Sequence, residues 1–198
     1  MTLQEIPSEQ FRERSIPVLE TERLVLRAPR LGDAKTVAVL ANDRRIAENT
    51  ARIPHPYRIA DAEDFIATAN VGNEAVFFIT LRNGTLIGAC GFTQVDRHPP
   101  EIGYWLGVKH WGKGYATEAV RRLLGLAFDD LGLHRVIARV DARNDASARL
   151  ARRLGMRQEA YLVRNEWFKG EWTDELDFAL LEEEWATWQQ NGSAPDPS

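Results

Sequence analysis

Residues 105–120 read WLGVKHWGKGYATEAV and carry the clearest structural signal in the chain. A β-type apolar run over residues 102–108 enters a short loop with two glycines, Gly112 and Gly114, and a long helical pattern follows at once. Such a junction presents free backbone N–H groups at a helix N-terminus, where the helix dipole also favours an anion, above all a phosphate. The glycines remove the Cβ atoms that would keep a phosphate from the backbone. The stretch predicts a phosphate-binding loop, with an ordinary glycine turn as the alternative.

The composition is typical of a globular protein with one domain. The 198 residues are 44% hydrophobic and 27% charged, and the formal net charge is −4. This acidic balance gives no reason to expect nucleic acid as a partner. The single cysteine, Cys90, excludes an intramolecular disulfide and a cysteine-based zinc cluster. No apolar run reaches the length of a membrane span, and the first residues lack a signal-peptide pattern, so we expect a cytoplasmic protein with no membrane partner.

Hydrophobic periodicity and turn residues divide the chain into strands and helices. The expected elements, in chain order, are a strand at 23–27, helices at about 34–41 and 61–70, strands at 75–81 and 86–95, the strand at 102–108, a helix at about 115–131, a strand at 136–140, a helix at about 146–154, and strands at about 157–168 and 172–181. Asp33 and Asp61 are expected to cap the first two helices. Asn144 or Asp145 is expected to cap the helix that ends before Gly155.

This order of elements predicts one mixed α/β domain, with a largely antiparallel sheet of about seven strands and about four flanking helices. Residues 1–20 are polar and are interpreted as an N-terminal arm, and the domain is expected to cover residues 21–190. Trp185 and Trp188 are expected to pack a final helical turn. Residues 191–198 are rich in Gly, Ser, Pro and Asp, which predicts a disordered tail.

Three motifs make the chain resemble a known family. Residues 21–27 read TERLVLR, residues 111–119 read WGKGYATEA, and residues 144–156 read NDASARLARRLGM. With the element order over about residues 21–182, they resemble the first strand, the pyrophosphate loop and the Asn-x-x-Ser helix of the GNAT superfamily of acetyl-CoA-dependent N-acetyltransferases. The run GYWL before the loop is most similar to the RimJ/RimL-like branch, which acetylates N-terminal amines of ribosomal proteins. The resemblance implies a GNAT domain with a central splay in its sheet.

The resemblance also implies where the cosubstrate acetyl-CoA would bind. The strand that ends at Val108 would splay from the strand at 136–140, and the pantetheine amides would add to the exposed edge. The diphosphate would sit on the amides of residues 112–117, and Asn144 would bind the pantetheine arm, be a plain N-cap, or serve both roles. The implied cofactor residues are Leu106, Gly107, Val108, Trp111, Gly112, Lys113, Gly114, Tyr115, Ala116, Thr117, Asn144 and Ser147. Three arginines either reach the adenosine 3′-phosphate or form a solvated helix face: Arg149, Arg152 and Arg153.

Two positions depart from the pattern of the family and shape the expected chemistry. Trp111 stands where the commonest loop begins with Gln or Arg, which backbone contacts to phosphate would tolerate. A related branch has a Tyr general acid where this chain has Ala151, so that mechanism is unavailable. The RimJ/RimL-like resemblance implies that Ser147, three residues after Asn144, acts on the departing thiolate, and the alternative is that it merely clears space for CoA. An amine must lose a proton to attack, and Glu101 is chosen as the general base, with a surface carboxylate as the alternative. The Val108 N–H would bind the carbonyl oxygen.

Cys90 and the histidines have no predicted catalytic role. Cys90 lies in the run GACGF, where a small buried hydrophobic residue is a better interpretation than an acetylated nucleophile. His55, His98 and His134 lack the mutual spacing of metal ligands, so no metal site is predicted.

The acceptor pocket is predicted from the two segments that flank the cleft in this fold, residues 44–58 and 164–175. Candidates for holding a cationic, partly apolar amine are Glu48, Tyr57, Glu166, Trp167 and Trp172. Three functions remain open: an N-acetyltransferase for a protein or peptide N-terminus, which is favoured, an acetyltransferase for a small amine or antibiotic, and a non-catalytic acyl-CoA-binding module. A homodimer is also left open.

Overall fold

The computed structural model describes residues 16–69, 71, 74–93 and 99–191. Most of the expected N-terminal arm, most of the turn at 96–100 and the expected tail after residue 191 lie outside these ranges. None of the described helices is both long enough and apolar enough to cross a membrane.

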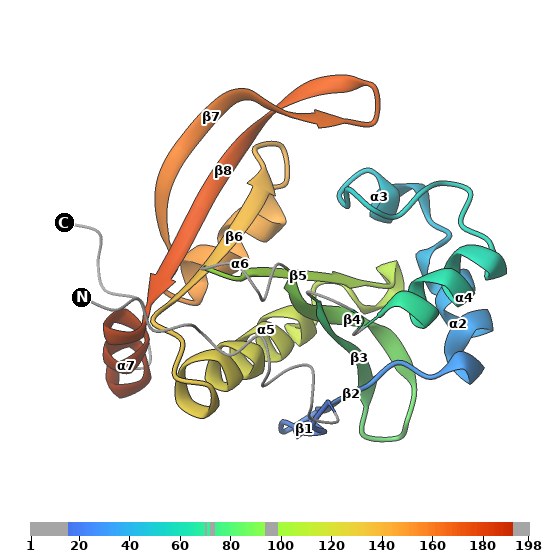
Figure 1. The fold of residues 1–198 in the computed structure, drawn as a ribbon, viewed down its shortest axis with the longest axis horizontal. Coiled ribbons are helices and arrows are strands. Elements are labelled where there is room, and N and C mark those ends of the chain that lie inside the picture. Colours follow the sequence, from blue (N-terminus) through green and yellow to red (C-terminus); the bar gives the residue numbers. More distant parts are fainter. Residues whose placement is uncertain (1–15, 70, 72–73, 94–98, 192–198) are drawn as a thin grey trace.

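The described strands form one sheet of eight, one more than the sequence predicts. The strands are β1 (Leu19–Glu20), β2 (Leu24–Arg27), β3 (Ala75–Leu81), β4 (Leu86–Thr93), β5 (Glu101–Leu106), β6 (Arg135–Asp141), β7 (Arg157–Phe168) and β8 (Glu171–Leu181). Their order across the sheet is β1-β2-β3-β4-β5-β6-β8-β7 (Figure 1). Every neighbouring pair is antiparallel except β5 and β6, so the prediction of a largely antiparallel sheet is confirmed.

The described residues form six α-helices rather than about four. They are α2 (Ala34–Ala41), α3 (Arg44–Ala47), α4 (Ile59–Thr68), α5 (Tyr115–Gly125), α6 (Asp145–Arg153) and α7 (Glu182–Asn191). A π-helical segment, Leu126–Asp130, continues α5, and short 3₁₀ turns occupy Leu31–Asp33 and Val108–His110. The one-turn helix α3 was missed because it has no apolar periodicity of its own. It forms because the Asp43 carboxylate accepts a hydrogen bond from the Arg45 N–H at 3.0 Å and caps the turn.

One of the predicted helix caps is wrong, and the other is confirmed in position but makes no side-chain capping bond. Asp61 does not cap α4, because that helix begins at Ile59 and Asp61 occupies its third position, from which its carboxylate accepts the Arg58 N–H at 2.6 Å. Asp33 is the N-cap residue of α2, as predicted, but its side chain makes no capping hydrogen bond to that helix, because Asp33 also ends the 3₁₀ turn that precedes it. Its carboxylate accepts the Arg30 N–H at 3.0 Å instead. Each of the two carboxylates therefore bonds the backbone N–H three residues before it, at the start of its own turn.

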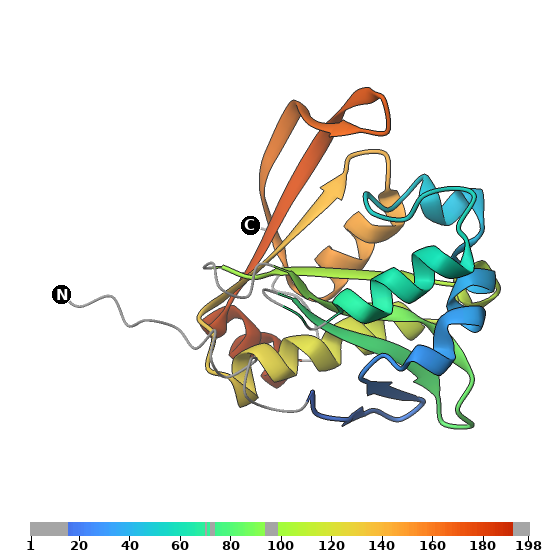
Figure 2. The ribbon, with the colours of Figure 1, turned by 45° about the vertical axis from the view of Figure 1, so that its right-hand side comes forward.

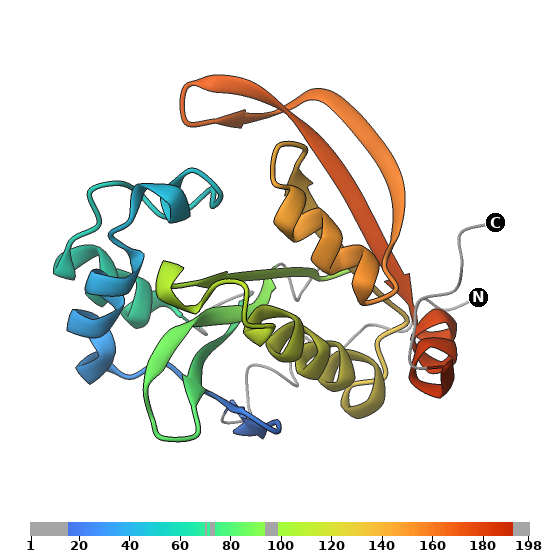
Figure 3. The same cartoon turned by 180° about the vertical axis from the view of Figure 1, so that it is seen from behind.

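Two hydrophobic cores cover opposite faces of the sheet. Phe77 and Ile79 of β3 join the core that contains α5, α6 and α7, whereas Phe78 between them faces the core under α2 and α4. Figures 2 and 3 show α5 and α4 on either side of the central strands. Trp185 of α7 stacks on Phe128 with ring centroids 5.9 Å apart, so the final helix packs through tryptophan as predicted.

The sheet opens between β5 and β6. Their parallel register contains one pair, Glu101 opposite Ile137, and the Ile137 N–H donates to the Pro100 carbonyl at 3.0 Å. Beyond this point β6, β8 and β7 rise away from β5 (Figure 1). The central splay implied by the resemblance is therefore confirmed. It leaves residues 102–106 of β5 and 138–141 of β6 without a strand partner on the sides that face the opening.

Candidate active site

The glycine loop has the backbone geometry that an anion site requires. Gly112 and Gly114 adopt φ values of +70° and +79°, a left-handed conformation that residues with a side chain rarely adopt. Gly114 is the N-cap of α5, so the loop delivers the chain directly into the helix N-terminus. The free N–H groups of the first turn therefore lie where the sequence predicts a phosphate.

Arg23 holds this loop from the bend that directly precedes β2. Its guanidinium donates to the Lys113 carbonyl at 3.0 Å and to the Glu118 carboxylate at 2.6 Å, and it lies 4.8 Å from the centre of the Tyr115 ring. Thr21 donates to the same carboxylate at 2.6 Å. The motif at 21–27 and the motif at 111–119 thus meet in space, which gives a physical reason for both to be present.

Trp111 closes the loop onto the end of β5. Its indole N–H donates to the Leu106 carbonyl at 2.7 Å, across five residues of chain. Trp111 occupies the position at which the commonest family pattern has Gln or Arg. The residue that departs from that pattern therefore links the loop to the strand before it.

A cavity of about 590 Å³ follows the loop and the start of α6. This volume lies within the usual range for a ligand pocket. The predicted cofactor residues that line it are Leu106, Trp111, Gly112, Gly114, Tyr115, Ala116, Thr117, Asn144 and Ser147. Gly107, Val108 and Lys113 lie beside it in the chain without lining it.

The three arginines of α6 divide into two sets. Arg149 and Arg153 line the 590 Å³ cavity and bring positive charge to it. Arg152 does not, because its guanidinium lies 5.3 Å from the Phe178 ring centre and donates to Gln158. Of these three residues, only Arg149 and Arg153 are therefore placed to contact a phosphate in this cavity.

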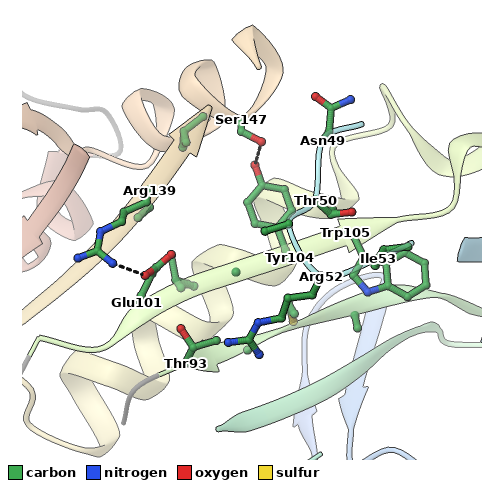
Figure 4. Close-up of a pocket in the computed structure, with 18 of the residues that line it drawn as sticks. Asn49, Thr50, Arg52, Ile53, Thr93, Glu101, Tyr104, Trp105, Arg139 and Ser147 are labelled. Carbon is green, nitrogen blue, oxygen red and sulfur yellow. Dashed lines mark hydrogen bonds and ion pairs between the residues drawn. The ribbon is translucent and has the colours of Figure 1, made fainter. Parts of the chain in front are cut away.

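A second cavity, of about 610 Å³, lies on the other side of β5 (Figure 4). It is bounded by residues 49–54, by α4, by β5 and by the free edge of β6. Tyr104, Trp105, Asn144 and Ser147 line both cavities, together with Asn49, Thr50 and Leu150. The two cavities therefore meet at the splay, where a group held in one could react with a group held in the other.

Glu101 lies in the second cavity at the point where the splay begins. Its carboxylate accepts a hydrogen bond from Arg139 at 3.1 Å (Figure 4). Burial raises the pKa of the Glu101 carboxyl, against the opposing charges of Arg139 and Arg52. A carboxylate with a raised pKa beside an open cavity has the properties expected of a proton acceptor.

Ser147 lies at the junction of the two cavities, one turn into α6. Its N–H donates to the Asn144 side chain at 3.1 Å, so Asn144 is the N-cap of α6, one of the two roles considered for it. The Ser147 hydroxyl accepts a hydrogen bond from the Tyr104 phenol at 3.0 Å. Tyr104 was missed by sequence reasoning, because nothing in its strand marks it as different from its neighbours.

Only some of the acceptor residues predicted from sequence line the second cavity. Tyr57 is buried and lines the second cavity. Glu48 does not line it and pairs with Arg44 at 2.9 Å. Trp167 and Trp172 form an exposed edge-to-face pair with centroids 5.3 Å apart, outside both cavities.

The predicted acceptor segments do meet above the second cavity. Lys169, at the tip of the β7–β8 hairpin, donates to the Ile53 carbonyl at 2.7 Å and also to the Ala47 carbonyl. Two arginines on the cavity wall, Arg52 and Arg139, were not predicted. Their partners, Glu74 and Glu101, are distant in sequence, so no local pattern reveals them.

The sequence agrees with this geometry. A family model described as an acetyltransferase (GNAT) domain matches residues 23–157, which include the Arg23 contact, the glycine loop and α6. The chain belongs to the GNAT family. It is an acetyl-CoA-dependent N-acetyltransferase of that family, and the predicted enzyme class is confirmed.

Similar proteins match this GNAT chain over half of its length or more. The N-acetyltransferase p20 of Bacillus licheniformis is 35% identical over 175 residues, which are 85% of this chain and 98% of that protein. The crystal structure of a GNAT-family acetyltransferase from Bacillus anthracis is 28% identical, with a TM-score of 0.77, and the match covers 85% of this chain and 100% of that one. The [ribosomal protein uS5]-alanine N-acetyltransferase of Escherichia coli is 31% identical over 103 residues, 50% of this chain and 53% of that protein. The RimJ/RimL-like resemblance therefore has support among relatives.

The contact of Arg23 with the GNAT loop predicts a binding defect. Arg23→Ala removes the donor to the Lys113 carbonyl and the partner of Glu118, so the loop loses its support. Hydrogen bonds of this kind contribute about 1.5–3 kcal/mol when one partner is charged, and exposure reduces that value, so we expect acetyl-CoA affinity to fall about 10-fold. Calorimetry measures the change.

The control for this prediction is Arg122→Ala, which removes a half-buried arginine from the far end of α5, where it pairs with Asp130 at 3.4 Å. This variant should bind acetyl-CoA as the unchanged protein does. Equal affinity losses in both variants would show that Arg23 has no specific part in holding the loop.

Proposed function

We propose that this enzyme transfers the acetyl group of acetyl-CoA to the α-amine of a protein or peptide N-terminus. The observation that carries the proposal is the free edge of β6. Residues 138–141 have no strand partner on the side of the splay, and all four line the second cavity. A free strand edge offers backbone N–H and C=O groups at the spacing that an extended peptide can pair with.

The size and chemistry of the second cavity agree with such an acceptor. Its volume of about 610 Å³ suits several residues of an extended chain better than a lone amine. Glu101 lies at the end of the cavity where the splay begins, so a peptide on β6 would bring its amine toward a proton acceptor. The similarity to an enzyme named as an N-acetyltransferase for an alanine of a ribosomal protein is also consistent with this class of acceptor.

The proposed transfer is direct. Glu101 takes the proton of the amine, and the amine attacks the thioester carbonyl, whose oxygen becomes negative. Val108, the predicted donor to that oxygen, lines neither cavity, so the role of its N–H stays a prediction. When the C–S bond breaks, the electron pair stays on sulfur, and the Ser147 hydroxyl donates a hydrogen bond to that sulfur. A covalent route through Cys90 is disfavoured, because that thiol is buried and its burial raises its pKa, so little reactive thiolate forms.

A small amine is the second candidate acceptor. The contact of Lys169 with Ile53 joins the β7–β8 hairpin to the segment after α3, and so covers one side of the cavity. A covered cavity favours a compact substrate, such as a polyamine or an aminoglycoside, over a long chain.

A screen of amine acceptors tests the proposal. Acetyl-CoA consumption is measured with peptides of varied first residue, with the same peptides blocked at the α-amine but carrying lysine, and with polyamines and aminoglycosides. We expect turnover with free peptide N-termini and none with the blocked peptides, because the α-amine is the reacting group. Turnover only with small amines would establish the second candidate. Acetyl-CoA binding without turnover of any of these amines would contradict both candidate acceptor classes.

Kinetics with an accepted amine test the direct route. Initial-rate lines at several acetyl-CoA concentrations should intersect, because both substrates occupy the two joined cavities at once. Parallel lines, or an acetylated Cys90 found by mass spectrometry during turnover, would contradict this mechanism.

A further inference from the structure

The hydrogen bond between Tyr104 and Ser147 spans the splay. Tyr104 belongs to β5 and Ser147 to α6, 43 positions later in the chain, and the two hydroxyl oxygens are 3.0 Å apart. Figure 4 shows the phenol pointing away from β5 toward the helix, in a different direction from Glu101. Both residues line both cavities, so the bond lies where the acetyl group would pass from one substrate to the other.

The direction of this bond decides what the serine hydroxyl can do. A serine hydroxyl has one hydrogen to donate and two lone pairs to accept with. Tyr104 donates to one of these lone pairs, so the bond between the two residues does not use the hydrogen of Ser147. That hydrogen remains available for an acceptor in the cavities. The bond from Tyr104 occupies one side of the serine oxygen, so the O–H of Ser147 can point only to the other sides.

The phenol is suited to donate without giving up its proton. Burial raises the pKa of the Tyr104 phenol above its ordinary value. An ordinary tyrosine has a pKa of about 10 and an alkyl thiol such as cysteine about 8.5, so proton transfer from phenol to thiolate is unfavourable. Tyr104 therefore stays protonated at neutral pH and remains a donor throughout the reaction.

We propose that Tyr104 is a positioning residue that aims the Ser147 hydroxyl at the sulfur of the departing thiolate. As the C–S bond breaks, the electron pair stays on sulfur and receives a hydrogen bond from Ser147, while Tyr104 keeps its own proton. The amine proton goes to Glu101, and the released thiolate takes a proton from solvent. This inference rests on the role of Ser147 in the proposed function. In the branch that has a Tyr where this chain has Ala151, that Tyr acts on the thiolate itself. Tyr104 comes from another element and acts only through Ser147.

The test is a double-mutant cycle on kcat. Tyr104→Phe keeps the ring and removes the hydroxyl, so kcat should fall about 3- to 10-fold, the usual effect of one hydrogen bond. The acetyl-CoA Kd should stay unchanged. Because Tyr104 acts through Ser147, the variant with both Tyr104→Phe and Ser147→Ala should be no slower than Ser147→Ala alone.

The matched control is Tyr161→Phe, which removes an exposed phenol of β7 that bonds Asp174 of β8, outside both cavities. It should leave kcat unchanged. An unchanged kcat in Tyr104→Phe, multiplied losses in the double variant, or a matching rise in the acetyl-CoA Kd would each overturn the inference. The cycle can be measured with any amine that the enzyme accepts, so a wrong class of acceptor overturns the proposed function without affecting this result.

Discussion

Gly114→Val is expected to reduce acetyl-CoA affinity about 100-fold, which corresponds to roughly 2.7 kcal/mol. Gly114 has a φ of +79° at the N-cap of α5, and a Cβ there would lie 3.3 Å from the Arg23 guanidinium. A branched side chain would occupy the space in front of the loop amides and press on the residue that holds the loop. Calorimetry on the folded variant measures the loss.

Strain at a positive φ also destabilises a protein, so the prediction needs a matched control. Gly84 has a φ of +85° in the β3–β4 turn, where a Cβ would meet nothing within 4 Å. Gly84→Val should therefore suffer a similar backbone strain and a similar fall in Tm, yet bind acetyl-CoA normally. An affinity loss common to both variants, or unchanged affinity in folded Gly114→Val, would contradict the assignment of the loop as the diphosphate site.

Glu101→Gln is expected to lower kcat about 10²- to 10⁴-fold, the range typical of a lost general base. A base must be ionised, so the wild-type rate should fall as the pH drops through the pKa of Glu101. Burial raises that pKa above its ordinary value of 4.5, so the fall should begin at a higher pH than for an exposed glutamate. Glutamine cannot titrate, and the variant should lose this acidic limb of the pH–rate profile.

Glu74→Gln is the control for this prediction, because Glu74 lines the same cavity and also pairs with an arginine, Arg52. It should keep the acidic limb and most of kcat, since it lies outside the start of the splay. If Glu101→Gln keeps the wild-type pH profile, the base is another group, and a water chain to a different carboxylate becomes the better mechanism.

The cofactor side of the protein was predictable because its signals are local. Two glycines one residue apart, a helix that begins directly after them, and an asparagine three positions before a serine each act within one or two turns of chain. The loop amides, the N-cap at Asn144 and the order of elements follow from such short-range patterns. The central splay also followed, through resemblance to the family rather than from residue patterns alone.

The acceptor side was predicted less well because its contacts join distant elements. Glu48, Trp167 and Trp172 have suitable chemistry and come from suitable segments, but none lines the second cavity. Whether a side chain faces that cavity depends on strand register and on the path of a hairpin, and neither is visible in a segment alone. The same holds for Arg52, whose place follows from its contact with Glu74.

By itself, the sequence determined the order of the elements and a glycine loop that leads directly into a helix, because those properties depend on backbone conformation within short segments, and its motifs resembled those of the GNAT family. Only the tertiary structure decided which side chains meet across the splay. Glu101 turns toward Arg139 on β6, and Tyr104 turns toward Ser147 on α6, although three positions separate them on one strand. Alternate residues of a strand face opposite sides, and the divergence of β5 from β6 places a different partner on each side.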